Sequence, residues 1–196
     1  QKCLILFADI SAAFYSALLQ LIAQCPASSE APNLDRALEG LALPSEALGV
    51  IRDHLAQHTA LMQAGASTWL ECLAAKVGHS NWFVLVNDDY PVSTARGTRP
   101  GSSWADVMFA ILIPRILRRR DEILLQLGAQ GEVPSFPWEA PIVVRHEATA
   151  LAEAFIEFGF RLSFGEHKTA ALVSVCGQRS RAAEKHLFGA GGLKGQ

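Results

Sequence analysis

The sequence predicts an α+β fold in which an antiparallel sheet is backed by helices on one face. Residues Cys3–Ala8 form a short apolar run without alternation, which is typical of a fully buried strand. Apolar residues then recur at helical spacing, and β-rich runs flank a turn sequence at Asn87–Tyr90. Hydrophobic residues make up 50% of the 196-residue chain, which is enough for one sizeable buried core.

The first half of the chain is predicted to be mainly helical. The spacing of apolar residues predicts a helix over Phe14–Cys25, with Ser11 as its N-cap. The stretch Pro26–Asn33 is predicted to be a polar loop. A second helix is expected from Pro44 to about Met62, and a third over Thr68–Val77.

A hairpin and a tight loop are predicted to follow the third helix. The hairpin pairs Asn81–Val86 with Pro91–Ala95 through the turn residues Asn87–Tyr90. The glycines and proline of Gly97–Gly101 then indicate a sharp change of chain direction.

The second half is predicted to alternate between helix and strand. A long helix starts at a capping box formed by Ser103 and Asp106, and Pro114 is expected to kink it. This helix is expected to end at Gln126 and to be followed by a loop over Gly128–Pro141 and a strand over Ile142–Val144. A further helix is expected over Glu147–Phe158, with Glu147 in its first turn. The last expected elements are two strands, Phe160–Phe164 and Ala170–Cys176, around a turn at Gly165–Lys168.

Composition excludes several function classes. The net charge of -2 gives no overall electrostatic case for nucleic acid or membrane surfaces, so any such case depends on local clusters. The four cysteines are far apart without a CxxC pair, which argues against a zinc ribbon and favours an intracellular, cytoplasmic or nuclear, location. No apolar run is long enough to cross a bilayer, so no membrane association is expected. A start at Gln1 suggests a fragment or a processed product.

Asp9 is the first residue that suggests chemistry, because it directly follows the apolar strand. A carboxylate on such a rigid support is a ligand that Mg²⁺ prefers. Two interpretations stay open from these residues alone. In the first, Asp9 is a metal ligand and Phe14 lies near it. In the second, Asp9 and Ser11 cap a helix and Phe14 fills the core.

Four segments, taken together, resemble the reverse transcriptase of non-LTR (LINE-type) retrotransposons. They are Phe7–Phe14, Arg96–Phe109, Gly159–Thr169 and, more weakly, Gly177–Arg181. The resemblance covers about residues 1–188 and leaves 189–196 as a flexible Gly-rich tail. It implies an incomplete polymerase palm without fingers and thumb. It also implies an ancestral RNA-directed DNA polymerase, a nucleotidyltransferase that uses an RNA template, a DNA primer and Mg²⁺.

The resemblance assigns roles to particular residues. It implies that Asp9 binds both metal ions, that Phe14 blocks the sugar 2′-hydroxyl, and that Lys168 lies near the leaving pyrophosphate as a general acid. The loop that packs on the nascent base pair corresponds to Arg96, Gly97, Pro100, Gly101 and Ser102. Family members usually carry Gln in place of Arg96.

One family motif is absent from the chain. The family has an Ala-Asp-Asp hairpin between the long helix and the Gly159 segment, whereas no Asp follows Asp121 here, as though residues had been lost near 144–148. One carboxylate cannot hold two divalent ions, because the uncompensated charge is too costly. Neither Glu147 nor the turn pair Asp88–Asp89 replaces the missing carboxylates convincingly. The sequence therefore predicts a catalytically inactive domain.

An alternative function is a non-catalytic nucleic-acid-binding or structural remnant. Arg115, Arg118, Arg119 and Arg120 form a basic cluster that either follows a phosphate backbone or is a solvated helix end. His54 and His58 are spaced for a shared metal, but a solvated helix face is the commoner use of this spacing.

Overall fold

The computed structural model describes most of the chain, which forms two compact units. The described residues are 2–24, 38–79, 82–87, 89–94, 96–98, 103–131, 139–165, 168–175, 181–182 and 185. Unit 1 consists of Gln1–Asp9, Arg120–Glu153 and Leu162–Gln196, and unit 2 of Ile10–Arg119 and Ala154–Arg161. The predicted loop Pro26–Asn33 and the tail 189–196 lie outside the described residues.

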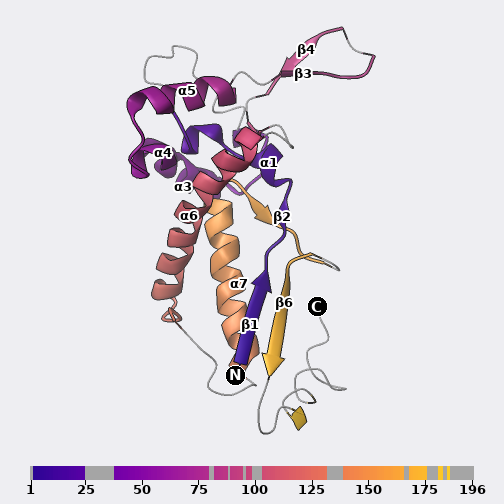
Figure 1. The fold of residues 1–196 in the computed structure, drawn as a ribbon. Helices are drawn as coiled ribbons and strands as arrows, with labels where there is room; N and C mark the ends of the chain where they lie inside the picture. The colour runs from indigo at the N-terminus through magenta and orange to yellow at the C-terminus, as the bar shows by residue number, and fades with distance from the viewer. Residues whose placement is uncertain are drawn as a thin grey trace. The chain divides into compact units, whose positions relative to one another are not determined.

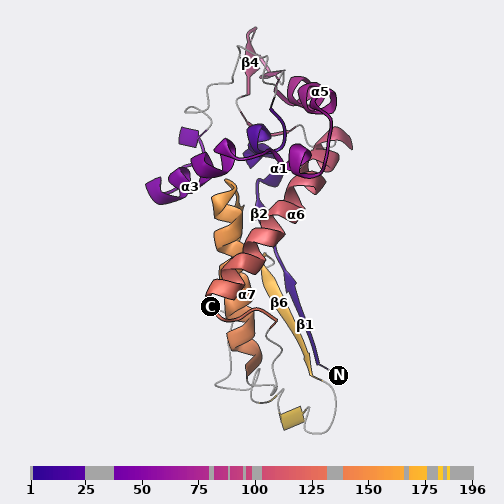
Figure 2. The same ribbon diagram turned by 90° about the vertical axis from the view of Figure 1, so that its left-hand side faces the viewer.

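Unit 1 contains the first and the last strand of the described chain. Strand β1 (Lys2–Phe7) pairs antiparallel with β6 (Ala170–Val175), and Phe7 lies opposite Ala170. Figures 1 and 2 both show this pair as a two-stranded ribbon, with the beginning of α7 (Ala140–Glu157) running beside it. The predicted strands at both ends of the chain are therefore confirmed as strands. The full burial expected of the first is wrong, because Ile5 is 40% and Phe7 57% exposed.

The described strands form three separate two-stranded sheets, in the orders β1-β6, β2-β5 and β3-β4. The mixed α+β class is confirmed, with small antiparallel sheets among many helices. One predicted pairing is wrong. Strand β5 (Arg161–Leu162) pairs with β2 (Ile10–Ser11) rather than forming a hairpin with β6, which pairs with β1.

The predicted hairpin is confirmed in unit 2. Strands β3 (Trp82–Val84) and β4 (Pro91–Ser93) are antiparallel, with Phe83 opposite Val92. Asn87 has a φ of 70° in the connecting loop, a left-handed conformation that asparagine tolerates better than most residues.

The predicted helix over Phe14–Cys25 is wrong. The chain instead forms a four-residue helix α1 (Ala13–Ser16) and a 3₁₀ turn η1 (Leu19–Leu21). All residues from 17 to 23 are buried, so this segment has no solvent-exposed face of the kind that an amphipathic helix needs. The apolar spacing therefore reflects complete burial rather than helical periodicity.

The second predicted helix is divided into two. Helix α3 (Ser45–Ala56) ends at an extended Gln57, and α4 (Ala60–Gln63) begins after Thr59. The Thr59 hydroxyl accepts a hydrogen bond from the Met62 N–H at 3.2 Å, which is an N-cap. The third helix is confirmed as α5 (Thr68–His79).

The long helix is confirmed as α6 (Ser103–Gln126), which continues through Pro114. The predicted strand over Ile142–Val144 is wrong, because these residues belong to α7. Their burial follows a helical period, since Val143, Ala150 and Ala154 are buried while Ile142 is 56% exposed. Residues 144–148, near which the sequence suggested that the Ala-Asp-Asp hairpin had been lost, lie within this helix.

Aromatic rings form a continuous series in the core of unit 2. Phe14 contacts Phe109 at a centroid distance of 5.8 Å, Phe109 contacts Phe160 at 5.7 Å, and Phe160 contacts Phe155 at 6.1 Å. The last two contacts are edge-to-face, a favoured geometry for aromatic pairs. Within the described ranges, no helix combines the length and the apolar character that crossing a membrane requires.

Candidate functional site

Asp9 lies in unit 1 at the end of β1 and does not cap a helix. Its carbonyl accepts a hydrogen bond from the Ser163 N–H at 2.7 Å, and its N–H donates to the Thr169 hydroxyl at 3.1 Å. Helix α1 instead follows a left-handed Ala12 and has no side-chain cap, while Ser11 belongs to β2. The capping interpretation of Asp9 and Ser11 is therefore wrong.

The Asp9 carboxylate forms an ion pair with Lys168. The distance from Lys168 Nζ to Asp9 Oδ2 is 3.2 Å, and the two side chains are 52% and 43% exposed. The segment from Ser163 to Thr169 supplies both this ammonium and the hydrogen bonds that hold the Asp9 backbone. Two residues that the sequence singled out separately thus lie together.

Phe14 and Gly97, two further candidate site residues, meet in unit 2. The Gly97 N–H donates to the Ala17 carbonyl at 2.8 Å, and the Thr98 N–H donates to the Phe14 carbonyl at 2.6 Å. Gly97 has a φ of +85°, and an added Cβ would lie 2.9 Å from the Tyr15 carbonyl oxygen. These two N–H groups of the loop are used within the chain, so they are not donors for a phosphate. The Phe14 ring is half-buried against Phe109.

Arg96 is half-buried, and its guanidinium lies against Gly40, within 3.2 Å of where a Cβ would stand. Burial lowers the pKa of Arg96 from its ordinary value. Its predicted neighbours in the loop, Pro100, Gly101 and Ser102, lie outside the described residues.

Arg115 is not available to a nucleic-acid backbone, because it is only 6% exposed. Its guanidinium donates to the carbonyls of His54 at 3.2 Å and His58 at 3.1 Å, beside the end of α3. It also lies over the ring of Phe158, 5.4 Å from the centroid. Burial, and then the charge of Arg118, lower the pKa of Arg115. Arg115 is therefore a structural cap for carbonyls at the end of a helix.

Two of the other three arginines in the cluster have carboxylate partners. In unit 2, Arg119 binds Glu157 through two hydrogen bonds of 2.6 and 3.0 Å. In unit 1, Arg120 pairs with Asp121 and lies 3.6 Å from Glu147. Glu147 is not a first-turn residue as predicted, because α7 begins seven residues earlier at Ala140.

Arg118 is exposed, and it donates to the Gln63 side chain at 3.3 Å. Among the exposed or half-buried members of the cluster, it is the one whose guanidinium has no carboxylate partner among the described residues.

His54 is not on a solvated helix face, which corrects the interpretation from spacing. Its side chain is 14% exposed, stacks on Phe158 at 4.5 Å and lies 3.4 Å from Glu157. Burial raises the pKa of Glu157, but hydrogen bonds and charges from Arg119 and then His54 outweigh it, so the pKa falls below its ordinary value. His58 is exposed, and its carbonyl is the acceptor for Arg115.

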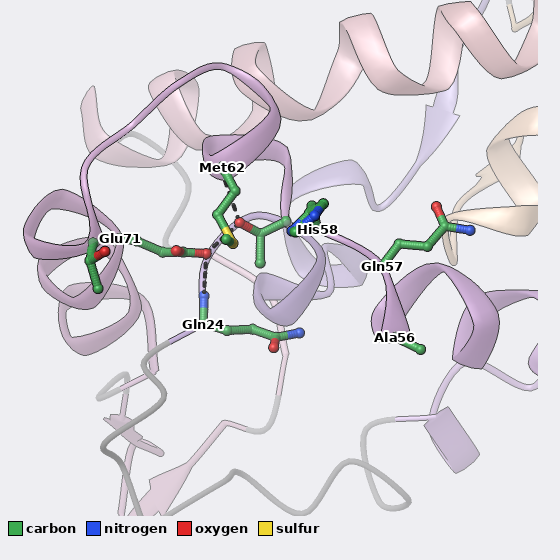
Figure 3. Close-up of a pocket in the computed structure, with 8 residues that line it drawn as sticks. Gln24, Ala56, Gln57, His58, Met62 and Glu71 are labelled. Carbon is green, nitrogen blue, oxygen red and sulfur yellow. Dashed lines mark hydrogen bonds between the residues drawn. The ribbon is translucent and has the colours of Figure 1, made fainter.

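A cavity of about 380 Å³ in unit 2 was not anticipated from the sequence. Figure 3 shows Gln24, His58, Met62 and Glu71 around it. Glu71 is 3% exposed, and its Oε1 accepts hydrogen bonds from the Thr59 hydroxyl and, at 3.3 Å, from the Gln24 N–H. A first-turn glutamate is common in helices, so nothing in the sequence distinguishes Glu71 as a cavity residue.

A two-metal site needs several carboxylates close together. Within the described ranges, no three His, Cys, Asp or Glu side chains gather closely enough to hold a metal ion. The described residues around Asp9 offer one carboxylate and one ammonium, a set that does not fit a pair of divalent cations. Comparisons with protein-family models, with curated proteins and with solved structures find no match to this chain.

Proposed function

We propose that the chain is a remnant of a reverse-transcriptase palm, of retrotransposon origin, and that it no longer polymerises DNA. The observation that carries this proposal is the contact between Asp9 and Lys168. The resemblance assigns these residues to one reaction centre, as metal ligand and as general acid. They come from two motifs whose residues Asp9 and Thr169 are 160 positions apart in sequence.

The order of elements in unit 1 supports the same proposal. In a β-α-β-β-α-β unit, the first and last strands are antiparallel neighbours, and each half contributes one helix. Here β1 and β6 are antiparallel neighbours, and the helical residues of unit 1 between them belong to the end of α6 and most of α7. A loss of the inner hairpin, the part that carries the Asp-Asp box in the family, would leave this arrangement.

The charge at Asp9 supports the loss of catalysis. A metal pair neutralises its carboxylate ligands, whereas here the Lys168 ammonium provides the positive charge at Asp9. Lys168 cannot donate a proton to a leaving pyrophosphate and also remain the counter-ion of Asp9 in the same position. We infer that the ion pair replaces the metal centre in this domain and that Mg²⁺ does not bind there as a pair.

The alternative, a non-catalytic nucleic-acid-binding remnant, has less support from the arginine cluster. Arg115 is buried, and Arg119 and Arg120 have carboxylate partners, so the cluster offers few free charges to a phosphate backbone. The alternative now depends on other exposed cations, such as Arg118, Arg181 and Lys185.

Primer extension on an RNA template with a DNA primer, in Mg²⁺ and separately in Mn²⁺, tests the proposal. We expect no template-dependent product from the natural chain, and no change in Asp9→Ala. Asp53→Ala is the matched control, because Asp53 is an exposed aspartate on α3. Template-dependent synthesis that Asp9→Ala abolishes and Asp53→Ala preserves would overturn the proposed loss of activity.

Fluorescence anisotropy with a labelled single-stranded RNA separates the two non-catalytic functions. A structural remnant gives no saturable binding at about 0.1 M salt. Binding that weakens steeply as salt rises, through counter-ion release, favours the nucleic-acid-binding remnant instead.

A further inference from the structure

The cavity in unit 2 is lined by a carboxylate that has one oxygen without a hydrogen bond to the described residues. Glu71 is 3% exposed, and its Oε1 takes both hydrogen bonds that the carboxylate accepts, from the Thr59 hydroxyl and the Gln24 N–H. Its Oε2 accepts no hydrogen bond from any described residue. This oxygen is not among the fully buried unpartnered side-chain atoms of the described chain, so it is accessible from the cavity that Glu71 lines.

Among the described residues, no lysine or arginine lines the cavity, and none forms an ion pair with Glu71. The ion pairs of unit 2 involve Glu157 instead. The nearest features that favour a negative charge are the two hydrogen bonds and the position of Glu71 in the first turn of α5. Figure 3 shows the carboxylate of Glu71 directed toward Gln24, with His58 and Met62 beside the space.

We propose that this cavity binds a small organic primary amine whose ammonium group pairs with Glu71 Oε2. An ammonium group would donate a charge-assisted hydrogen bond to this oxygen. The volume of about 380 Å³ corresponds to roughly a dozen water molecules at about 30 Å³ each, so it accommodates an alkyl chain as well as the ammonium. Apolar wall atoms from Ala56 and Met62 would contact that chain.

The test uses n-butylammonium as the probe and the full 196-residue chain, followed by two-dimensional amide NMR. We expect saturable shifts of the Gln24, Met62 and Glu71 amide resonances, with a dissociation constant in the millimolar range that is usual for so few atoms. Neutral n-butanol, which has the same chain length, should bind at least about tenfold more weakly because it lacks the charge.

Two variants and one control locate the site. Glu71→Gln keeps the acceptor for Thr59 and Gln24 but removes the charge, so the affinity for n-butylammonium should fall at least about tenfold. Glu46→Gln, an exposed residue of α3, should leave the affinity unchanged. Met62→Trp should weaken binding by filling the cavity, and Met62 is 45% exposed, so the larger side chain can be accepted.

Absence of saturable shifts in the natural chain would overturn the proposal. Equal binding of the amine and the alcohol, or unchanged binding in a folded Glu71→Gln variant, would overturn it as well. If circular dichroism shows that Glu71→Gln does not fold, Met62→Trp decides the matter, because unchanged affinity in that variant excludes the cavity as the site. None of these outcomes depends on whether the chain extends a primer.

Discussion

At the scale of single residues, most of the residues that the sequence suggested as catalytic or binding residues make contacts that stabilise the fold. Gly97 lies against the backbone of Tyr15, Arg115 caps carbonyls at the end of α3, and Lys168 neutralises Asp9. In each case a group that could serve a ligand is satisfied within the chain. This pattern agrees with the proposal that the domain kept its packing contacts and lost a catalytic motif.

Gly97→Ala should destabilise the protein by roughly 2 kcal/mol or more. Alanine is strained at a φ of +85°, and its Cβ would lie 2.9 Å from the Tyr15 carbonyl oxygen. Gly49→Ala is the matched control, because Gly49 lies in α3 with no atom within 4 Å of an added Cβ. That change should stabilise the helix by up to about 1 kcal/mol. Urea unfolding measures both, and equal effects would contradict the loop geometry.

Glu157→Gln should remove a pH-dependent part of the stability. The folded-state pKa of Glu157 lies below its ordinary value of 4.5, so its contribution is present above about pH 4.5 and is lost as pH falls through the folded pKa. Near pH 7 the variant should be about 2 kcal/mol less stable, because the bidentate partner of Arg119 is lost. Urea unfolding of both proteins from pH 7 to pH 3 should show this difference shrinking below pH 4.5. A constant difference would argue against the lowered pKa.

At the scale of secondary-structure elements, helices with one exposed face were predictable and fully buried segments were not. Helix α5 and most of α6 have the periodicity that sequence reveals. Residues 17–23 are all buried, and tertiary hydrogen bonds from Gly97 and Thr98 to the carbonyls of Ala17 and Phe14 fix the turns of this segment. Periodicity cannot report a bond to a residue some eighty positions away, so this segment was mistaken for one helix.

Local propensity also misled in α7. The β-branched run Ile142–Val144 favours a strand, but its residues continue the helical burial pattern of Ala150 and Ala154. The candidate site was predictable only in part, for a related reason. Asp9 and Lys168 could be selected as residues, but their contact depends on the pairing of β1 with β6, which no local pattern encodes.

Two alanine substitutions should distinguish helix from strand in this run. In a helix, Ile142→Ala should change stability by no more than about 0.5 kcal/mol, because Ile142 is 56% exposed and alanine is the better helix former. Val143→Ala should cost about 1–2 kcal/mol, because Val143 is 7% exposed. Urea unfolding measures both, and Cα chemical shifts report the backbone state. A loss near 1 kcal/mol for Ile142→Ala with strand-like shifts would refute the helix.

At the scale of the whole molecule, strands from distant parts of the sequence meet in unit 1, and α6 and α7 each contribute residues to both units. The hairpin β3–β4 in unit 2 instead joins neighbouring segments. The chain between the paired strands is much longer for β1 and β6 than for β3 and β4. The pairing of β1 with β6 therefore defines the topology and is the feature that most needs a direct test.

Engineered cysteines test the register of β1 and β6. Ile5 lies opposite Leu172, and both are exposed, so a disulfide between Ile5→Cys and Leu172→Cys should form readily after the natural cysteines are replaced by serine. Ile5→Cys with Ala170→Cys is the control, because Ala170 pairs with Phe7, two positions away on the same face. Mass spectrometry of the digested protein should find the first cross-link in large excess. Equal yields would contradict the register.

The β1–β6 pairing also has a consequence for synthesis on the ribosome. Asp9 and Thr169 are hydrogen-bonded although 160 residues separate them, so β1 emerges long before its partner exists. At about 5–20 residues per second, that wait lasts roughly 8–30 s. During this time an apolar strand with Ile5 and Phe7 lacks the neighbour that it has in the finished fold. Nascent chains are therefore exposed to strand-mediated aggregation, and chaperones that hold extended apolar segments should raise the yield of folded protein.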